Sequence, residues 1–284
     1  MKTPILKSLG RMQCLFGTLL IVAAMAGVSA RGAELLVGSA SGGRLVLFAS
    51  DQPEDVAVVH LAGLQPDEEI LGVDMRPATG QLYALGSSSR IYAIDLAARS
   101  ASPVGAGSFT PALSGTRFGF DFNPTVDRIR IVSDNGQNLR AHPDTGVIVA
   151  VDGSLAYATN DAGFGLNPMA AGAAYINNDT NPATGTVLYN LDAGRDVLVI
   201  QNPPNAGALT TVGALGVDVT GVAGLDVAAS DGTAYASLVE AGQRGESDRA
   251  SLYTINLVTG AATLVGRIGG PKPLLSLAAL GSIP

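Results

Sequence analysis

Short apolar runs alternate with polar turns along the chain, and the clearest group of them lies between residues 69 and 105. The alternation predicts strands over 71–75, 81–85 and 90–96, and a fourth strand that ends at 105. The turn at 77–80 has the sequence PATG, in which proline pre-sets φ and glycine takes the positive φ that closes the turn. Four strands joined by turns form an antiparallel meander, the unit of a propeller blade.

The same pattern recurs at the spacing that a propeller requires. A Gly-x-Asp strand signature ends at Asp74, Asp121 and Asp226, at intervals of 47 and 105 residues. A later strand recurs at Tyr92 and Tyr189, 97 residues apart. Periods of about 40–50 residues with strands inside indicate a propeller and not a helical solenoid. We therefore expect units over 69–105, 117–153, 155–213 and 222–266.

The two ends of the chain complete a fifth unit. The first segment, 34–64, lacks a partner strand, and the last apolar run, 274–280, supplies one. Pairing the ends closes the ring and removes an open sheet edge. The prediction is an all-β propeller with five four-stranded antiparallel blades. Six blades are an alternative if 152–169 hides another, and a two-layer sandwich is the competing fold.

The N-terminal segment has the features of a secretory signal peptide. Lys2, Lys7 and Arg11 precede the apolar run 14–27, and small residues follow up to Ala30. The run is shorter than the roughly 20 residues that span a membrane, so we expect cleavage after Ala30 and not an anchor. This places a single propeller domain, 31–284, in the periplasm or outside the cell, with no membrane span after cleavage.

Composition restricts the chemistry of the domain 31–284. It would carry 14 basic and 24 acidic residues, a net charge of −10, which argues against nucleic-acid binding. The only cysteine, Cys14, lies in the signal segment, so no disulfide, thiol nucleophile or cysteine metal site is expected. Two isolated histidines, His60 and His142, form no zinc triad. The sequence therefore predicts neither a cofactor nor a metal.

Two blocks of the sequence carry a resemblance to a known family. They are GFDFNPTVDRIRIVSDNGQNLRAHPDTG, at 119–146, and LYNLDAGRDVLVIQNPPNAGALTTVGALG, at 188–216. With the GLDV run at 224–227, they resemble a bacterial secreted family named domain of unknown function 4394, over about residues 35–280. The resemblance implies a propeller-like fold and export. It implies no activity, substrate or catalytic residue.

Three carboxylates are candidate catalytic residues. On a strand, the Gly and the Asp of Gly-x-Asp point to one face. If these strands are innermost, Asp74, Asp121 and Asp226 approach the central channel, where a glycoside-type hydrolase would use two of them as acid and base or nucleophile. The alternative is structural, with each Asp accepting backbone N–H bonds in its own blade's turn. Alanine replaces the Asp in one repeat, at Ala174, which favours the structural interpretation.

A group of arginines is the candidate ligand site. Guanidinium groups suit a carboxylate, phosphate or sulfate, and four of them concentrate in one unit of an acidic chain. The alternative is ion pairing with Asp121, Asp127 and Asp134. If Arg130 binds a ligand, Arg130→Ala should weaken anion binding without changing thermal stability. The candidate residues are Arg117, Asn123, Arg128, Arg130, Gln137, Asn138 and Arg140.

The sequence as a whole favours an exported, non-enzymatic binding or interaction module. Its partner would be an unknown small ligand or a macromolecule of the cell envelope or extracellular space. The hydrolase is the first alternative, and a structural or adhesion module of the envelope is the second. Fold alone cannot choose among them.

Overall fold

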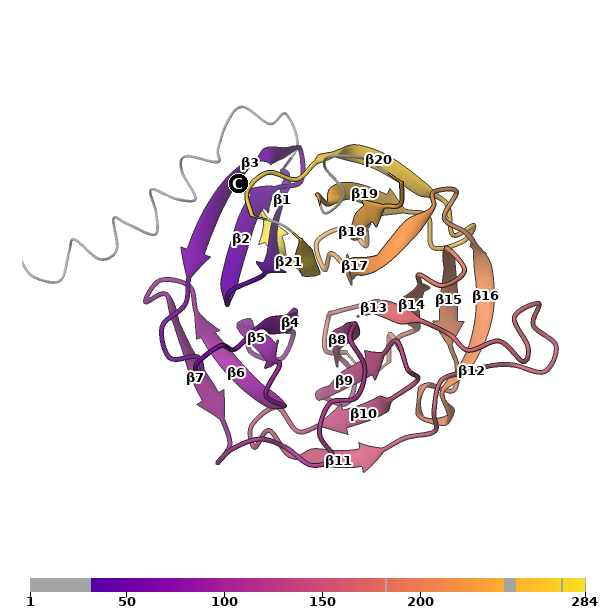
Figure 1. Ribbon diagram of the computed structural model, residues 1–284, viewed down its shortest axis with the longest axis horizontal. Coiled ribbons are helices and arrows are strands. Elements are labelled where there is room, and N and C mark those ends of the chain that lie inside the picture. Colours follow the sequence, from indigo (N-terminus) through magenta and orange to yellow (C-terminus); the bar gives the residue numbers. More distant parts are fainter. Residues whose placement is uncertain (1–31, 182, 243–248, 272, 284) are drawn as a thin grey trace, which may run out of the picture.

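The computed structural model describes residues 32–181, 183–242, 249–271 and 273–283. Its strands form five sheets arranged around a central axis as a propeller, which confirms the predicted fold (Figure 1). The predicted signal peptide, residues 1–30, lies outside the described residues, so its cleavage stays a prediction. In the described part of the chain, we find no helix whose length and apolar character would let it cross a membrane.

Each blade is a twisted sheet, with its strands named in order from the innermost, at the axis, to the outermost. Blade 1 contains β21 (Leu274–Ser282), β1 (Glu34–Ala40), β2 (Arg44–Ala49) and β3 (Gln52–His60). Blade 2 contains β4 (Ile70–Arg76), β5 (Gln81–Gly86), β6 (Arg90–Asp95) and β7 (Ser100–Val104). Blade 3 contains β8 (Phe118–Asn123), β9 (Arg128–Ser133), β10 (Asn138–Ala141) and β11 (Ile148–Val151).

The last two blades follow the same order. Blade 4 contains β13 (Ala170–Tyr175), β14 (Leu188–Asp192), β15 (Val197–Gln201) and β16 (Ala208–Ala214), with the short helix η1 (Pro204–Ala206) between the last two. Blade 5 contains β17 (Val219–Val227), β18 (Ala234–Glu240), β19 (Ser251–Ile255) and β20 (Ala262–Arg267). The alternative of a sixth blade is wrong, because β12 (Ala156–Tyr157) pairs in parallel with β16 as an outer strand of blade 4.

The two chain ends close the ring as expected. Strand β21 pairs antiparallel with β1, with Val37 opposite Ala278 and Gly38 opposite Leu277. The innermost strand of blade 1 therefore comes from the C-terminus and the other three from the N-terminus. This pairing covers the inner edge of β1 and joins the two ends of the sequence in one sheet.

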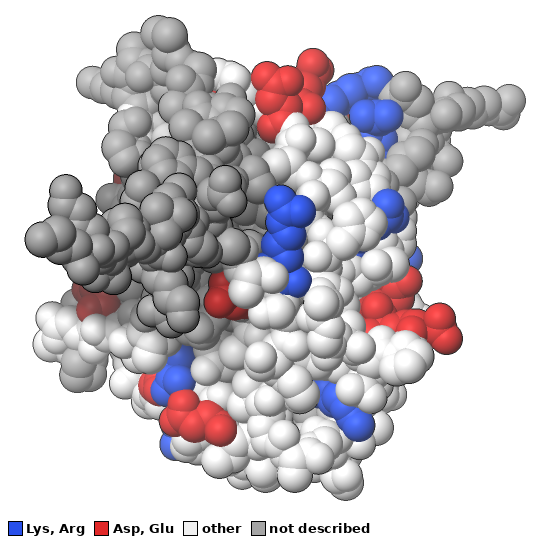
Figure 2. Space-filling view, turned by 90° about the vertical axis from the view of Figure 1, so that its left-hand side faces the viewer, with Lys and Arg blue, Asp and Glu red and all other residues white. Residues whose placement is uncertain are grey.

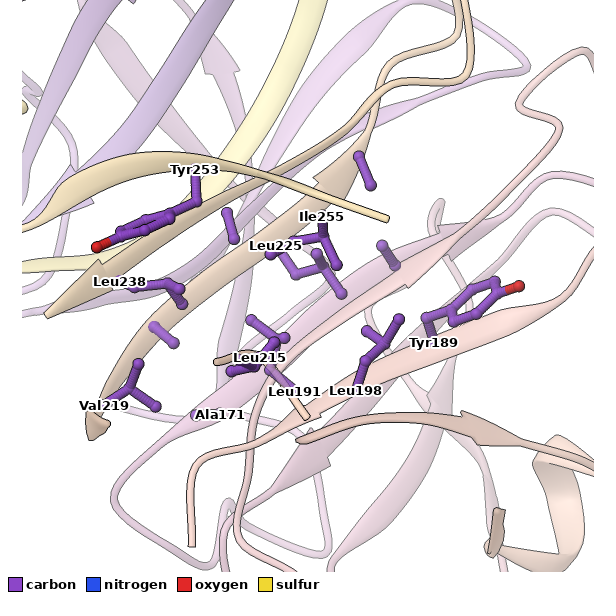
Figure 3. Close-up of a cluster of buried hydrophobic side chains, with 14 of the residues drawn as sticks. Ala171, Tyr189, Leu191, Leu198, Leu215, Val219, Leu225, Leu238, Tyr253 and Ile255 are labelled. Atoms are coloured by element: carbon purple, nitrogen blue, oxygen red, sulfur yellow. The ribbon is translucent and has the colours of Figure 1, made fainter. Parts of the chain in front are cut away.

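The apolar core is divided among the spaces between neighbouring blades. Figure 3 shows the cluster between blades 4 and 5, where Leu191 and Leu198 of blade 4 meet Leu225 and Leu238 of blade 5. Alternate residues of each strand point to opposite faces of its sheet, so every blade contributes to two such clusters. Each cluster removes apolar side chains from water and fixes the angle between two sheets.

Glycine of the Gly-x-Asp signature allows the innermost strands to approach closely. A methyl group on Gly224 would lie 2.5 Å from the backbone nitrogen of Leu277 in β21. A methyl group on Gly119 would lie 2.7 Å from the backbone nitrogen of Ala173 in β13. Such contacts are with backbone atoms, which cannot rotate away.

Gly224→Ala should therefore destabilise the ring. Overpacking against a neighbouring strand costs about 1–3 kcal/mol. A urea unfolding series would measure the loss. Gly107→Ala is the control, because nothing lies within 4 Å of a methyl group at that position, and it should change stability by less than about 0.5 kcal/mol. Equal stability of the two variants would contradict the close-approach argument.

Candidate functional site

The three predicted carboxylates meet at the axis. One oxygen of each of Asp74, Asp121 and Asp226 lies within 4.8 Å of the other two. All three side chains are buried, with 1–5% of their surface exposed. They come from the innermost strands of blades 2, 3 and 5, which is the convergence that the strand periodicity predicted. In blades 1 and 4 the corresponding positions carry Ala278 and Ala174.

Each carboxylate binds the innermost strand of the next blade. Asp74 accepts the N–H of Phe122 at 2.7 Å, and Asp226 accepts the N–H of Ala279 at 2.6 Å. Asp121 accepts the N–H of Tyr175 at 3.0 Å. The structural interpretation placed these bonds within each residue's own blade, and that detail is wrong. The bonds cross between blades because Gly-x-Asp faces the neighbouring sheet, although Asp74 and Asp226 also accept the N–H of the residue that follows them.

Burial and mutual repulsion disfavour ionisation of the three groups. Burial is the larger cause for all of them. It raises the pKa of Asp226 to about 7. The pKa of Asp74 is raised by burial and then by the charge of Asp226, and the pKa of Asp121 by burial and then by the charges of Asp74 and Asp226. Three charges at this separation cannot all persist without a proton or a cation between them.

The axial arrangement suits structure better than hydrolysis. A glycosidase needs two carboxyl groups about 5–10 Å apart around a space for the substrate. Here the side chains are buried, they clamp adjacent strands, and neither of the two cavities described below is lined by them. Among the described residues, Asp74, Asp121 and Asp226 could hold a divalent cation, because one oxygen of each lies close enough to the others to share it.

Arg128, Arg130 and Arg140 lie on one face of blade 3. Arg128 and Arg130 are two residues apart on β9, so they share a face. Arg140 lies directly opposite Arg130 on β10, and Asn123 lies opposite Arg128 on β8. Directly opposite residues point the same way. This face looks toward blade 4, because Gly119 and Asp121 on the same side of β8 contact Ala173 and Tyr175.

Arg130 holds blades 3 and 4 together. Its side chain is 2% exposed. Its guanidinium donates to Asn138 at 2.7 Å, to Asp152 at 2.6 Å and to Asn205 of blade 4 at 2.7 Å. A fourth, longer bond of 3.4 Å reaches the hydroxyl of Tyr175. Arg130 is therefore a buried ionic anchor and presents little of itself to a ligand.

The expected ion pairs of the arginine group are wrong. Arg130 and Arg140 both pair with Asp152, and Arg140 holds it at 2.7 and 3.0 Å through Nε and Nη2. Asp127 pairs instead with Arg76 of blade 2, and Asp134 accepts hydrogen bonds from Thr116. Sequence proximity favoured Asp127 and Asp134, but the β-turns direct them away from this face.

A cavity of about 420 Å³ lies between blades 3 and 4. We name it the anion cleft. Its size is in the range of small-molecule sites. Four of the seven residues predicted for ligand binding line it, and the other lining residues come from the β8–β9 turn, from β13 and from η1. The lining residues are Asn123, Val126, Arg128, Arg130, Arg140, Tyr175, Pro204 and Asn205.

The remaining predicted residues lie elsewhere. Asn138 is buried behind the cleft, where it accepts from Arg130 and donates to the carbonyl of Pro204. Gln137 is bound to the backbone of Ala112 and Ser114. Arg117 donates to the carbonyl of Thr116 and does not line the cleft.

Sequence reasoning missed three residues that build the cleft. Asp152 lies just after β11 and holds two of the arginines. Asn205 and Tyr175 come from blade 4, 75 and 45 residues from Arg130. A strand register could have found Asp152 as a diagonal neighbour of Arg140. No local signal identifies the blade 4 residues, because their approach depends on how two sheets pack.

The side chains that line the anion cleft present hydrogen-bond donors. Toward described residues, Arg128 uses only Nη1, which donates to the carbonyl of Asp127 at 2.7 Å and more weakly to that of Val126. The side-chain oxygen of Asn205 accepts from Arg130, and that of Asn123 accepts from the N–H groups of Thr125 and Val126. The remaining polar groups of the lining side chains are guanidinium and amide N–H groups, and the hydroxyl of Tyr175, which accepts a long bond from Arg130.

The cleft is a departure from the repeat. The position of Arg130, opposite the Asp of Gly-x-Asp, is occupied by Tyr83 in blade 2, Tyr189 in blade 4 and Tyr235 in blade 5. In blade 1 it is occupied by Val37. The position of Arg140 is likewise uncharged in the other four blades: Leu47, Ala93, Ile200 and Thr254. Departures of this kind from a repeat are expected at functional or strained sites.

The charged surface elsewhere is dispersed. On the outer side shown in Figure 2, charged residues form small separate groups among uncharged ones.

A second cavity of about 420 Å³ lies beside blade 1, between the β1–β2 turn and the 61–69 linker. Its buried carboxylate, Glu68, is already bound by Ser88 and Tyr92. Those hydrogen bonds lower the pKa of Glu68 against the opposing effect of burial, which is the largest single influence.

The comparisons with known proteins identify the family of this chain. The sequence model of a family described as domain of unknown function (DUF4394) matches residues 44–278. No curated protein matches the chain. One similar solved structure is a structural genomics protein of unknown function from Bacteroides thetaiotaomicron, with a TM-score of 0.49 and 14% identity. The similarity covers 89% of this chain and 66% of the other.

Proposed function

This chain belongs to the DUF4394 family, and since the family's description names no activity, we propose from the geometry that it is an exported binding module for a small anion. The anion cleft between blades 3 and 4 is the proposed site. The observation that carries the proposal is a cavity lined by three arginines and by no acidic side chain among the described residues, in which most polar groups are donors. Export rests on the signal features of residues 1–30.

Hydrogen bonds from neighbouring residues hold two guanidinium groups of the cleft in fixed positions. Asp152 and Asn205 hold Arg130 rigidly, and Asp152 also fixes the plane of Arg140. A guanidinium that is already ordered loses little conformational freedom when a ligand binds. Arg128 and the Nη1 group of Arg140 remain able to donate to a carboxylate or phosphate. Such charge-assisted hydrogen bonds are the strong ones.

Removing one of these donors should weaken anion binding. We expect Arg128→Gln and Arg140→Gln each to lower the affinity for a small carboxylate or for phosphate by about 10- to 100-fold, the loss of one hydrogen bond to a charged group. Isothermal titration calorimetry at low ionic strength measures the effect, because salt screens exposed charges.

Arg117→Gln is the matched control for this experiment. It removes the same charge from the same blade but lies outside the cleft, so affinity should remain within about twofold. Equal losses in all three variants would show a non-specific effect of net charge. Unchanged affinity in both cleft variants would place the anion elsewhere.

A further inference from the structure

We infer that the ligand of the anion cleft is a small organic dianion that carries two separate acidic groups on a short linker. This inference rests on the proposed function and names the ligand class of the same site. Four features of the cleft support it: the free N–H groups of two arginines, the net positive charge of the lining, the scarcity of acceptor side chains, and the apolar carbon of the lining.

The guanidinium groups of Arg128 and Arg140 keep N–H groups that can donate to a ligand. The three guanidinium nitrogens of Arg130, which lies beside both, already donate to the protein. Arg130 is opposite Arg140 and two residues from Arg128, so Arg128 and Arg140 are diagonal neighbours across β9 and β10. Diagonal positions in a sheet are roughly 7–8 Å apart at Cα. Nε and Nη2 of Arg128 make no hydrogen bond to a described residue, and Arg140 keeps Nη1 free. Each free edge fits one acidic group.

The residues around the cleft carry a net positive charge that two negative charges on a ligand would balance. Arg128, Arg130 and Arg140 line it, and Asp152 behind them neutralises one unit. Asp144 is close enough for the charge of Arg128 to help lower its pKa, after the larger effect of Arg76, but that carboxylate is already bound by Arg76 of blade 2. A ligand with two acidic groups would balance the remaining charge of the cleft.

The lining offers few acceptors beyond the hydroxyl of Tyr175, which selects against neutral polyols. A sugar hydroxyl donates as well as accepts, and its proton needs an acceptor. In this cleft the side-chain oxygens of Asn123 and Asn205 already accept hydrogen bonds from the protein. A buried donor without a partner costs affinity. The oxygens of an ionised carboxylate only accept, so a dicarboxylate satisfies the cleft without that cost.

The linker of the ligand would meet an apolar surface. Val126 and Pro204 contribute aliphatic carbon to opposite sides of the cleft, one from the β8–β9 turn of blade 3 and one from η1 of blade 4. Burying methylene groups against them is favourable. A saturated chain of a few carbons between two acidic groups combines both requirements.

A titration series tests the inference. The probes are propionate, succinate, glutarate, adipate, inorganic phosphate and xylitol, measured by isothermal titration calorimetry on the purified protein. We expect the best dicarboxylate to bind at least about tenfold more tightly than propionate, because its second group binds at high effective concentration. In Arg128→Gln or Arg140→Gln that advantage should fall to about twofold, because only one free guanidinium edge is left for the two acidic groups. Arg117→Gln should retain it.

The outcomes separate this inference from the proposed function. Equal affinity for propionate and the dicarboxylates, or phosphate as tight as the best dicarboxylate, would overturn the requirement for two groups and leave anion binding intact. Xylitol as tight as the best dicarboxylate would refute the donor argument. If none of the anions binds, the proposed function itself fails.

Discussion

Arg130→Ala should cost the protein roughly 3–5 kcal/mol of stability, the penalty for breaking a buried ion pair by removing one partner. The guanidinium is 2% exposed, and its loss removes one of the two arginine partners of buried Asp152 and leaves the side-chain oxygens of Asn138 and Asn205 without their donor. These groups come from two blades, so the sheets on both sides of the cleft should loosen together. Urea unfolding measures the loss directly.

Arg117→Ala provides the comparison, because that half-buried side chain makes one long hydrogen bond, to a backbone carbonyl, and no ion pair with a described residue. It should change stability by less than about 0.5 kcal/mol. The sequence alone predicted that Arg130→Ala would leave stability unchanged, and the buried network reverses that expectation. If the two variants unfold at the same urea concentration, Arg130 is not the anchor that its contacts indicate.

Stability should fall as the pH rises from about 4 to above 7. A carboxyl group whose pKa is raised on folding holds its proton more tightly in the folded chain, so its contribution is present at low pH and is lost as the pH passes the folded pKa. Asp226, with a pKa raised from 3.8 to about 7, accounts for roughly 4 kcal/mol over this range. Asp74 and Asp121 act in the same direction.

Other carboxylates oppose this trend at lower pH. The pKa of Asp144 is lowered first by its hydrogen bond from Arg76, and the pKa of Asp161 is lowered by hydrogen bonds from Thr211 and Gly163 that outweigh burial. Their contributions are lost as the pH falls below their unfolded values. We therefore expect maximal stability in mildly acidic solution. Thermal unfolding between pH 4 and 9 in the presence of a chelator measures the profile, and a rise in Tm from pH 5 to 8 would contradict it.

Asp121→Asn should flatten this profile. Both oxygens of Asp74 and of Asp226 accept N–H groups, whereas Asp121 uses one oxygen for Tyr175. An amide at position 121 can keep that bond, removes one charge and can donate toward its two neighbours. The variant should exceed the native protein in stability at pH 8, while Asp226→Asn places an N–H₂ group against a backbone N–H and should lose stability. Since Asp121 has the oxygen without an N–H partner, it is the group on which we expect a shared proton to reside, and the opposite order of the two variants would contradict that expectation.

The strands and their grouping could be predicted from the sequence because they depend on local physics. The period of two along each run and the Pro and Gly of the turns specify strands and tight turns whatever surrounds them. The 47-residue interval from Asp74 to Asp121 then indicates a ring. The partnership of Leu274–Ser282 with Glu34–Ala40 was also predictable, because each apolar run lacked a partner without the other.

The direction of the axial carboxylates was half predictable. Periodicity places Gly and Asp of each Gly-x-Asp on one face, so convergence could be expected. Which neighbour they bind depends on the packing of adjacent blades, and only the folded ring brings the N–H of Phe122 to Asp74. Burial, which raises their pKa values, is likewise a property of the whole ring.

The sequence by itself determined that an all-β ring forms, that its ends join, and that one blade carries arginines where a neighbouring repeat carries tyrosine. Only the tertiary structure decided which of those arginines are anchors and which can reach a ligand. The reason is that Asp152, Tyr175 and Asn205 approach Arg130 across the space between two sheets. Contacts of that kind depend on the angle between blades, which is set by the collective packing of the apolar clusters and leaves no signature in any one segment.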